Sequence, residues 1–184
     1  MSTLTPVFPR QPTPPLDLTL VGGDEWSLSA QDPENFTMVV IYRGFHCPIC
    51  SRYMASLNNL ADEFAKKGVN VLVASSDDEA RATQAKQDWG LDKLDVGYGL
   101  SLENGRKWGL YISKGRGATS TGVEEPALFL EPGLFLIRPN GELYFTLTQS
   151  MPFARPAFKE ILGAIEFVIA NDYPGRGEVI DHTS

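Results

Sequence analysis

Two short hydrophobic runs stand on either side of a segment with a different hydrophobic period. The runs 38–42 (MVVIY) and 69–75 (VNVLVAS) are rich in β-branched residues, which is typical of strands buried on both faces. Between them, hydrophobic residues recur at the spacing of one helix face, at Cys50, Met54, Leu57, Ala61 and Phe64. The pattern predicts a strand, one amphipathic helix that stops at Gly68, and a second strand.

The segment after the second strand begins with acidic residues. Asp77, Asp78 and Glu79 fall at the start of a predicted helix over about 78–89, where the positive end of the helix dipole favours carboxylates. The two strands and the helix between them make a βαβ unit. A weaker strand signal follows at 94–96, and a short helix is expected over about 102–110.

The last third of the chain predicts a loop, a hairpin and a helix. Residues 113–126 (SKGRGATSTGVEEP) are rich in Gly, Ser and Thr, as in a surface loop. The runs 134–137 and 143–147 flank Asn140-Gly141, which is a strong hairpin signal. Apolar residues on one face predict a final helix over about 156–170. A parallel βαβ unit followed by a hairpin and a helix predicts a mixed α/β sandwich.

Length and composition indicate one globular domain. The 184 residues are enough to form a sizeable hydrophobic core without a metal ion or several disulfides. We expect an extended N-terminal arm over 1–15, which is rich in proline, a single domain over 16–172 and a C-terminal tail over 173–184.

The charge balance narrows the range of partners. The chain carries a net charge of -7, with 42% hydrophobic and 21% charged residues. Because an acidic chain repels phosphate backbones and anionic lipid, we expect neither nucleic acid nor a membrane as a partner. The N-terminus lacks the basic and apolar regions of a signal peptide, and no apolar run is long enough to span a bilayer. A cytoplasmic location is therefore expected.

Both cysteines of the chain lie in the stretch 42–50, YRGFHCPIC. A CxxC pair is half of a zinc site, a redox dithiol or a coincidence among core residues. A structural zinc ion needs four ligands, and only His46 and His182 are available beside Cys47 and Cys50. In a reducing compartment two close cysteines are more often catalytic or metal-binding than a structural disulfide. The redox dithiol is favoured, with no metal and no cofactor expected.

The predicted place of Cys47 at the start of a helix supports redox chemistry. With Cys47 as N-cap and Pro48 at the first helical position, the sulfur meets unpaired amides and the positive end of the dipole, which favour the thiolate. Cys50 continues the apolar stripe and should face the core, whereas Cys47 should be the more exposed sulfur. This geometry favours attack by Cys47 and resolution by Cys50. Arg43 and Arg52 flank the site, either as activating charges or as ordinary solvated arginines.

The order of elements resembles the thioredoxin superfamily, and residues 43–50 are similar to the peroxiredoxin active-site loop, which usually runs Pro-Gly-x-x-Thr-Pro-x-Cys. Further similarity is found at Trp89-Gly90, at 107–110 (KWGL) and at 134–144 (LFLIRPNGELY). The chain thus looks like the peroxiredoxin-like proteins of the alkyl hydroperoxide reductase and thiol-specific antioxidant family. The resemblance implies a thioredoxin-like fold with a central mixed β-sheet flanked by helices.

Carried onto this sequence, the resemblance gives Cys50 the position of the peroxide-attacking cysteine and Cys47 that of the family's threonine. Arg43 replaces the loop proline, and Pro132 stands about where a later arginine is expected. Thioredoxins instead place a cis-proline before the corresponding strand, and Pro132 is a candidate for that role. His46 is a candidate proton donor or acceptor, with a partly exposed loop histidine as the alternative. Arg155 is interpreted as a surface arginine at a helix entry, with a reach to the active site as the alternative.

Three functions stay open. The leading one is a thiol-dependent antioxidant enzyme that reduces hydroperoxides through a Cys47/Cys50 dithiol-disulfide cycle, with a thioredoxin- or glutaredoxin-type reductant. The second is a thioredoxin-like enzyme that attacks protein disulfides with Cys47. The third is a non-catalytic module that senses redox state or binds a partner. A homodimer is a further open expectation.

Overall fold

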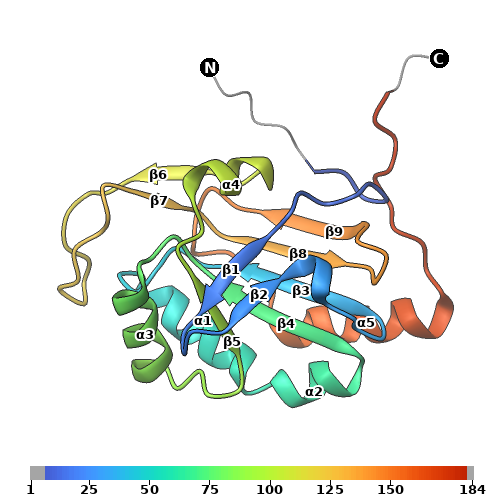
Figure 1. The fold of residues 1–184 in the computed structure, drawn as a ribbon, viewed down its shortest axis with the longest axis horizontal. Coiled ribbons are helices and arrows are strands. Elements are labelled where there is room, and N and C mark those ends of the chain that lie inside the picture. Colours follow the sequence, from blue (N-terminus) through green and yellow to red (C-terminus); the bar gives the residue numbers. More distant parts are fainter. Residues whose placement is uncertain (1–6, 182–184) are drawn as a thin grey trace.

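A computed structural model describes residues 7–181, and its centre is one mixed β-sheet (Figure 1). The sheet order is β2-β1-β5-β4-β3-β8-β9, in which β3 pairs parallel with β4, and β4 pairs parallel with β5. β8 pairs antiparallel with β3 and with β9. The strands of this sheet are β1 (Asp17–Leu20), β2 (Glu25–Ser27), β3 (Phe36–Ile41), β4 (Val69–Ala74), β5 (Asp95–Tyr98), β8 (Gly133–Ile137) and β9 (Leu143–Thr148). The predicted thioredoxin-like α/β fold is confirmed.

The helices lie on both faces of the sheet (Figure 1). Residues of α1, α2, α3 and α5 share one hydrophobic core with the even-numbered residues of β3, and Trp108, which directly follows α4, packs in a second core on the other face. Because successive side chains of a strand point to opposite faces, a strand covered on both sides must be apolar throughout. The helices are α1 (Pro48–Asn58), α2 (Ala61–Lys66), α3 (Glu79–Asp88), α4 (Leu102–Lys107) and α5 (Phe158–Asn171), with a 3-10 turn at Leu28–Ala30.

The single helix predicted over Cys50 to Phe64 is wrong in one respect, since it is broken at Asn59 and Leu60. Asn58, at the end of α1, is buried and held by the chain before β5: its amide donates to Asp92 at 2.8 Å, and its carbonyl oxygen accepts from Lys93 N at 3.0 Å. The apolar stripe continues across the break, so that Leu57 and Phe64 are both fully buried. The hydrophobic period alone therefore did not reveal the break.

Two strand pairs were not predicted. β1 and β2 form an antiparallel hairpin around Gly22 and Gly23, and β1 extends the sheet beside β5. The other pair, β6 (Ile112–Lys114) with β7 (Leu128–Leu130), is a separate two-stranded ribbon that joins the ends of the predicted loop. In Figure 1 the ribbon projects beyond the end of the main sheet, and we call residues 115–127 at its tip the arm.

The sequence predicts that residues 1–15 and 173–184 lie outside the domain. These boundaries stay a prediction. Residues Arg10 and Gln11 exchange backbone hydrogen bonds with Leu143 of β9. Among the described residues, no helix is long and apolar enough to cross a membrane.

Candidate active site

Cys47 begins α1, as the sequence predicts. A short loop connects the end of β3 to this helix, with Cys47 as the N-cap and Pro48 at the first helical position. The backbone N–H of Cys50 donates a hydrogen bond to Cys47 Sγ at 3.3 Å. This N–H would otherwise have no partner in the first turn, so the sulfur takes the place of a capping oxygen. Both thiols are free.

Cys47 was expected to be the more exposed of the two sulfurs, but both are buried. Its exposed fraction is 1% and that of Cys50 is 0%. Phe45 stacks on Trp89 at 6.1 Å between ring centres, and these rings, with Thr121 and Val123 of the arm, line a depression of about 320 Å³ that reaches Cys47. Trp89 is half-buried, and it packs against the main core as well as bordering the site. Cys47 is the sulfur that borders this opening, whereas Cys50 faces the core as predicted.

The surroundings shift the pKa values of the two thiols in opposite directions. The pKa of Cys47 is lowered to about 6, first by the hydrogen bond from the Cys50 thiol, then by the Cys50 backbone N–H and the positive charges of Arg43 and Arg155, against the opposing effect of burial. The pKa of Cys50 is raised, first by burial and then by its hydrogen bond to Cys47. Both directions favour a thiolate on Cys47 over a thiolate on Cys50.

Arg155 reaches the active site, which was the alternative to its interpretation as a surface arginine. Its Nη2 donates to Cys50 Sγ at 3.2 Å, although the two residues are 105 positions apart. The guanidinium lies 4.9 Å over the ring of Tyr53, whose hydroxyl donates to Pro156 O at 2.8 Å. Its interpretation as a surface arginine is therefore wrong. The available signal was its setting in MPFARP (151–156), between hydrophobic residues and prolines.

Arg43 acts on the site as a charge and not as a hydrogen-bond donor to sulfur. Its guanidinium pairs with Glu131 at 3.3 Å and with Glu125 at 3.5 Å, and it lies 4.6 Å over the ring of Phe129. These contacts tie the loop before α1 to β7 and the arm. Arg52 is exposed on α1 and has no bond to either sulfur.

His46 is not a partly exposed loop histidine, because it is completely buried. Its ring lies 4.7 Å from that of Phe129, and neither ring nitrogen has a hydrogen-bond partner among the described residues. Burial, and secondly the charge of Arg43, lower its pKa to about 4. It is therefore neutral at pH 7, and its role in proton transfer stays a prediction.

The loop around Gly44 is held by Asp77. Phe45 N donates to Asp77 Oδ2 at 2.7 Å. Gly44 has φ +138°, and a Cβ at this position would lie 2.7 Å from Asp77 Oδ1. Glycine is thus required here both by the backbone angle and by the close carboxylate.

Pro132 is buried directly before β8. No described peptide bond is cis, so its candidacy as a cis-proline is wrong. Pro132 and Arg155 line the same small cavity of about 10 Å³. The position at which the resemblance implies an arginine is thus next to an arginine that comes from another segment of the chain.

In residues 7–181, no three His, Cys, Asp or Glu side chains form a group that would hold a metal ion. His182, the second candidate zinc ligand, lies outside these residues.

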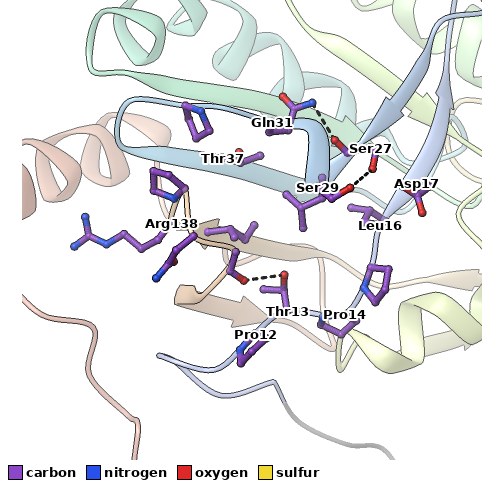
Figure 2. A pocket seen from close by; sticks show the side chains of 17 residues that line it. Pro12, Thr13, Pro14, Leu16, Asp17, Ser27, Ser29, Gln31, Thr37 and Arg138 are labelled. Atoms are coloured by element: carbon purple, nitrogen blue, oxygen red, sulfur yellow. Dashed lines mark hydrogen bonds between the residues drawn. The ribbon is translucent and has the colours of Figure 1, made fainter.

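A further depression lies at the opposite end of β3 (Figure 2). It has a volume of about 400 Å³, and Thr37 of β3 lines it. Figure 2 shows Thr13 bonded to a backbone oxygen of the β8–β9 turn, that of Gly141 at 3.2 Å. The charged residues of its lining are Asp17 and Arg138, and it contains no cysteine or histidine. The reactive groups are therefore concentrated at the Cys47 end of the sheet.

Residues 9–146 match the AhpC/TSA family. Solved structures with a similar fold include the reduced 2-Cys peroxiredoxin of Plasmodium vivax, with a TM-score of 0.72, 15% identity, and coverage of 90% of this chain and 99% of that one. A peroxiredoxin-like protein from Aquifex aeolicus has a TM-score of 0.71 and 15% identity, with 90% of each chain covered. AhpC of Mycobacterium tuberculosis has a TM-score of 0.68 and 17% identity, with 91% and 96% covered. The curated proteins gave no match.

Proposed function

Because the chain belongs to the AhpC/TSA family, whose peroxiredoxin-like members are thiol peroxidases, we propose that it reduces hydroperoxides by cycling Cys47 and Cys50 between a dithiol and a disulfide. The observation that carries the assignment of roles is the contrast between the two sulfurs. Cys47 borders the depression next to Trp89 and has a pKa lowered to about 6, whereas Cys50 is buried with a raised pKa. Cys47 is therefore the attacking thiolate and Cys50 the resolving thiol.

The cycle balances with one peroxide and one external dithiol. The Cys47 thiolate attacks the terminal peroxide oxygen, the O–O bond breaks, and the alkoxide takes a proton and leaves as an alcohol. Cys47 is then a sulfenic acid. Cys50 attacks the Cys47 sulfur, an S–S bond forms, and the S–O bond breaks to release water with the Cys50 proton. An external dithiol returns two electrons and restores both thiols.

This assignment differs from the family pattern, in which the residue at the Cys50 position attacks. The difference is supported by the depression, which Cys47 borders and Cys50 does not, and by the cap at Cys47. Since a thiolate is the nucleophile, the thiol with the lower pKa and the adjacent opening has the advantage at neutral pH.

The proposed partners follow from this chemistry. The substrate is a hydroperoxide, and the reductant is a thioredoxin- or glutaredoxin-type dithiol. We further propose a cytoplasmic location and a homodimer, for which the family membership is the support.

Stopped-flow reaction with hydrogen peroxide and with cumene hydroperoxide tests the assignment. The reduced wild type, Cys47→Ser and Cys50→Ser are compared by mass spectrometry after trapping with dimedone. We expect Cys50→Ser to form a stable sulfenic acid at the wild-type rate, and Cys47→Ser to react no faster than free cysteine. If Cys47→Ser forms the sulfenic acid instead, the roles of the two cysteines are reversed. If no variant reacts faster than free cysteine, the peroxidase proposal fails.

A further inference from the structure

Arg155 carries a positive charge that is partly buried and has no carboxylate partner among the described residues. No carboxylate oxygen lies within salt-bridge distance of its guanidinium in the part of the chain that the structure describes. Its Nε and Nη1 are buried without a hydrogen-bond partner there, and Nη2 donates to Cys50 Sγ at 3.2 Å. A buried charge without a counter-ion is unfavourable unless a group next to it can take the opposite charge. The Cys50 thiol is placed to do so.

Tyr53 fixes the guanidinium in this position through its ring and its hydroxyl. The Tyr53 ring lies against one face at 4.9 Å, and the Tyr53 hydroxyl holds the adjacent Pro156 carbonyl. Tyr53 is itself stacked on Phe158, the first residue of α5, with 4.2 Å between ring centres. The arginine is thus positioned by packing and not by an ion pair.

We propose that Arg155 is the catalytic residue of the second step, in which it holds the Cys50 sulfur as a thiolate for attack on oxidised Cys47. This proposal rests on the proposed function, since it assigns a residue to the resolution step. In the reduced protein the negative charge on Cys47 opposes a second charge on Cys50. Once Cys47 is a neutral sulfenic acid, that opposition is gone, and Arg155 remains as the nearby positive charge.

These charges determine when Cys50 ionises during disulfide formation. The Cys50 proton is lost only after Cys47 has been oxidised, and it leaves in the water that forms from the sulfenic hydroxyl. Arg155 does not take up or release a proton, because a guanidinium stays charged in proteins. Its contribution is to raise the fraction of Cys50 that is ionised at neutral pH, which sets the rate of disulfide formation.

The lifetime of the Cys47 sulfenic acid tests the proposal in the full-length chain. Reduced wild type, Arg155→Lys and Arg155→Met are mixed with hydrogen peroxide, and sulfenic acid and disulfide are counted by mass spectrometry after dimedone quench. Arg52→Gln is the matched control, because Arg52 lies on the same helix as Cys50 but is exposed. We expect Arg155→Met to lengthen the lifetime by about tenfold or more, which corresponds to a tenfold loss of thiolate per pKa unit. Arg155→Lys should fall in between, and Arg52→Gln should match the wild type.

The pH profile separates this role from a structural one. The rate of disulfide formation should reach its half-maximum at a higher pH in Arg155→Met than in the wild type. Equal lifetimes, or longer lifetimes with an unchanged pH midpoint, would overturn the proposal. If Arg155→Met loses the far-UV circular dichroism of the wild type, Arg155→Lys replaces it. The sulfenic acid lifetime and the pH midpoint are then measured on Arg155→Lys.

A direct thiol titration keeps the proposal independent of the peroxidase assignment. In the Cys47→Ser background Cys50 is the single cysteine, and it is titrated by the pH dependence of its iodoacetamide alkylation, followed by mass spectrometry. We expect its midpoint to move upward when Arg155→Met is added and to stay unchanged with Arg52→Gln. An unchanged midpoint in both overturns the role of Arg155, even if peroxide is reduced. A shifted midpoint in a chain that does not reduce peroxide supports it while the peroxidase proposal fails.

Discussion

The backbone N–H of Cys50 donates to Cys47 Sγ at 3.3 Å, within the first turn of α1. The side chain of Cys50 acts in the same direction as its backbone N–H and is the largest cause of the lowered pKa of Cys47. The local geometry of the helix start therefore gives the two thiols different pKa values. The inequality, and not the CxxC spacing alone, assigns different roles to the cysteines.

Removal of the Cys50 thiol should raise the pKa of Cys47. The largest cause of the lowered value is the hydrogen bond from the Cys50 side chain, which Cys50→Ala deletes while the backbone N–H remains. The pH dependence of iodoacetamide alkylation, followed by mass spectrometry, should have a midpoint near 6 for Cys47 in the wild type and about one unit higher in Cys50→Ala. Cys50→Ser, which keeps a donor, is the control and should lie between them. Equal midpoints in all three would contradict the assigned cause.

The reduced protein should gain stability as the pH rises from 6 to 9. The folded pKa of Cys47 is about 6 and its ordinary value is 9.0, so the unfolded chain binds more protons in this window. This favours the folded state by at most about 4 kcal/mol at pH 9, and the gain is lost as the pH falls through 6. A disulfide across so short a loop adds only about 2 kcal/mol.

Urea unfolding of the reduced and oxidised forms at pH 5.5, 7 and 8.5 measures this difference. The oxidised form should be the more stable at pH 5.5, its advantage should shrink by pH 7, and the reduced form should be the more stable at pH 8.5. Reduced Cys47→Ser provides the control and should lack the increase. A constant gap across the three pH values would be inconsistent with a Cys47 thiolate in the folded protein.

His46 should destabilise the protein in acid. Its folded pKa is about 4 and its ordinary value is 6.5, so the unfolded chain binds the proton first as the pH falls. Stability is complete above pH 6.5 and is lost towards pH 4, by at most about 3 kcal/mol. In His46→Phe the unfolding free energy should change less between these two values than in the wild type. Parallel curves for the two proteins would exclude a buried neutral His46.

Glu125 should hold the arm over the Cys47 opening. Its carboxylate accepts from Arg116 N at 2.8 Å and pairs with Arg43. We expect Glu125→Ala to increase trypsin cleavage after Lys114 and Arg116 by about tenfold, because proteolysis follows local opening of the chain. Alkylation of Cys47 should also accelerate. Glu124→Ala is the matched control, since the bond from Arg81 goes to the Glu124 backbone oxygen and survives the substitution. Similar cleavage in both variants would argue against the anchor.

The centre of the fold was predictable because its signals are local. β3 and β4 are short runs rich in apolar, β-branched residues, and the Asn140-Gly141 turn marks the hairpin directly. β1 and β2 were missed because their strands have only four and three residues. β1 is held by its pairing with β5, and β2 by its pairing with β1; the contact with β5 is one that no local pattern encodes.

The cysteines were predictable as a pair, whereas their surroundings were not. The cap at Cys47 follows from Pro48 and the helical period. The burial of Cys47 depends on Trp89 and on Val123 of the arm, and the bond from Arg155 to Cys50 joins segments that are distant along the chain. These contacts arise from tertiary packing, so spacing and propensity could not give them.

Within residues 7–181, β6 and β7 pair only with each other, outside the seven-stranded sheet. Changes of length or sequence within the arm therefore leave the hydrogen-bond ladder of the main sheet intact. Since Thr121 and Val123 of this arm border the opening to Cys47, evolution or an engineer can reshape what reaches the sulfur by exchanging one hairpin tip. Substitutions in the arm can therefore change which molecules reach Cys47 without changing the pairing of the main sheet.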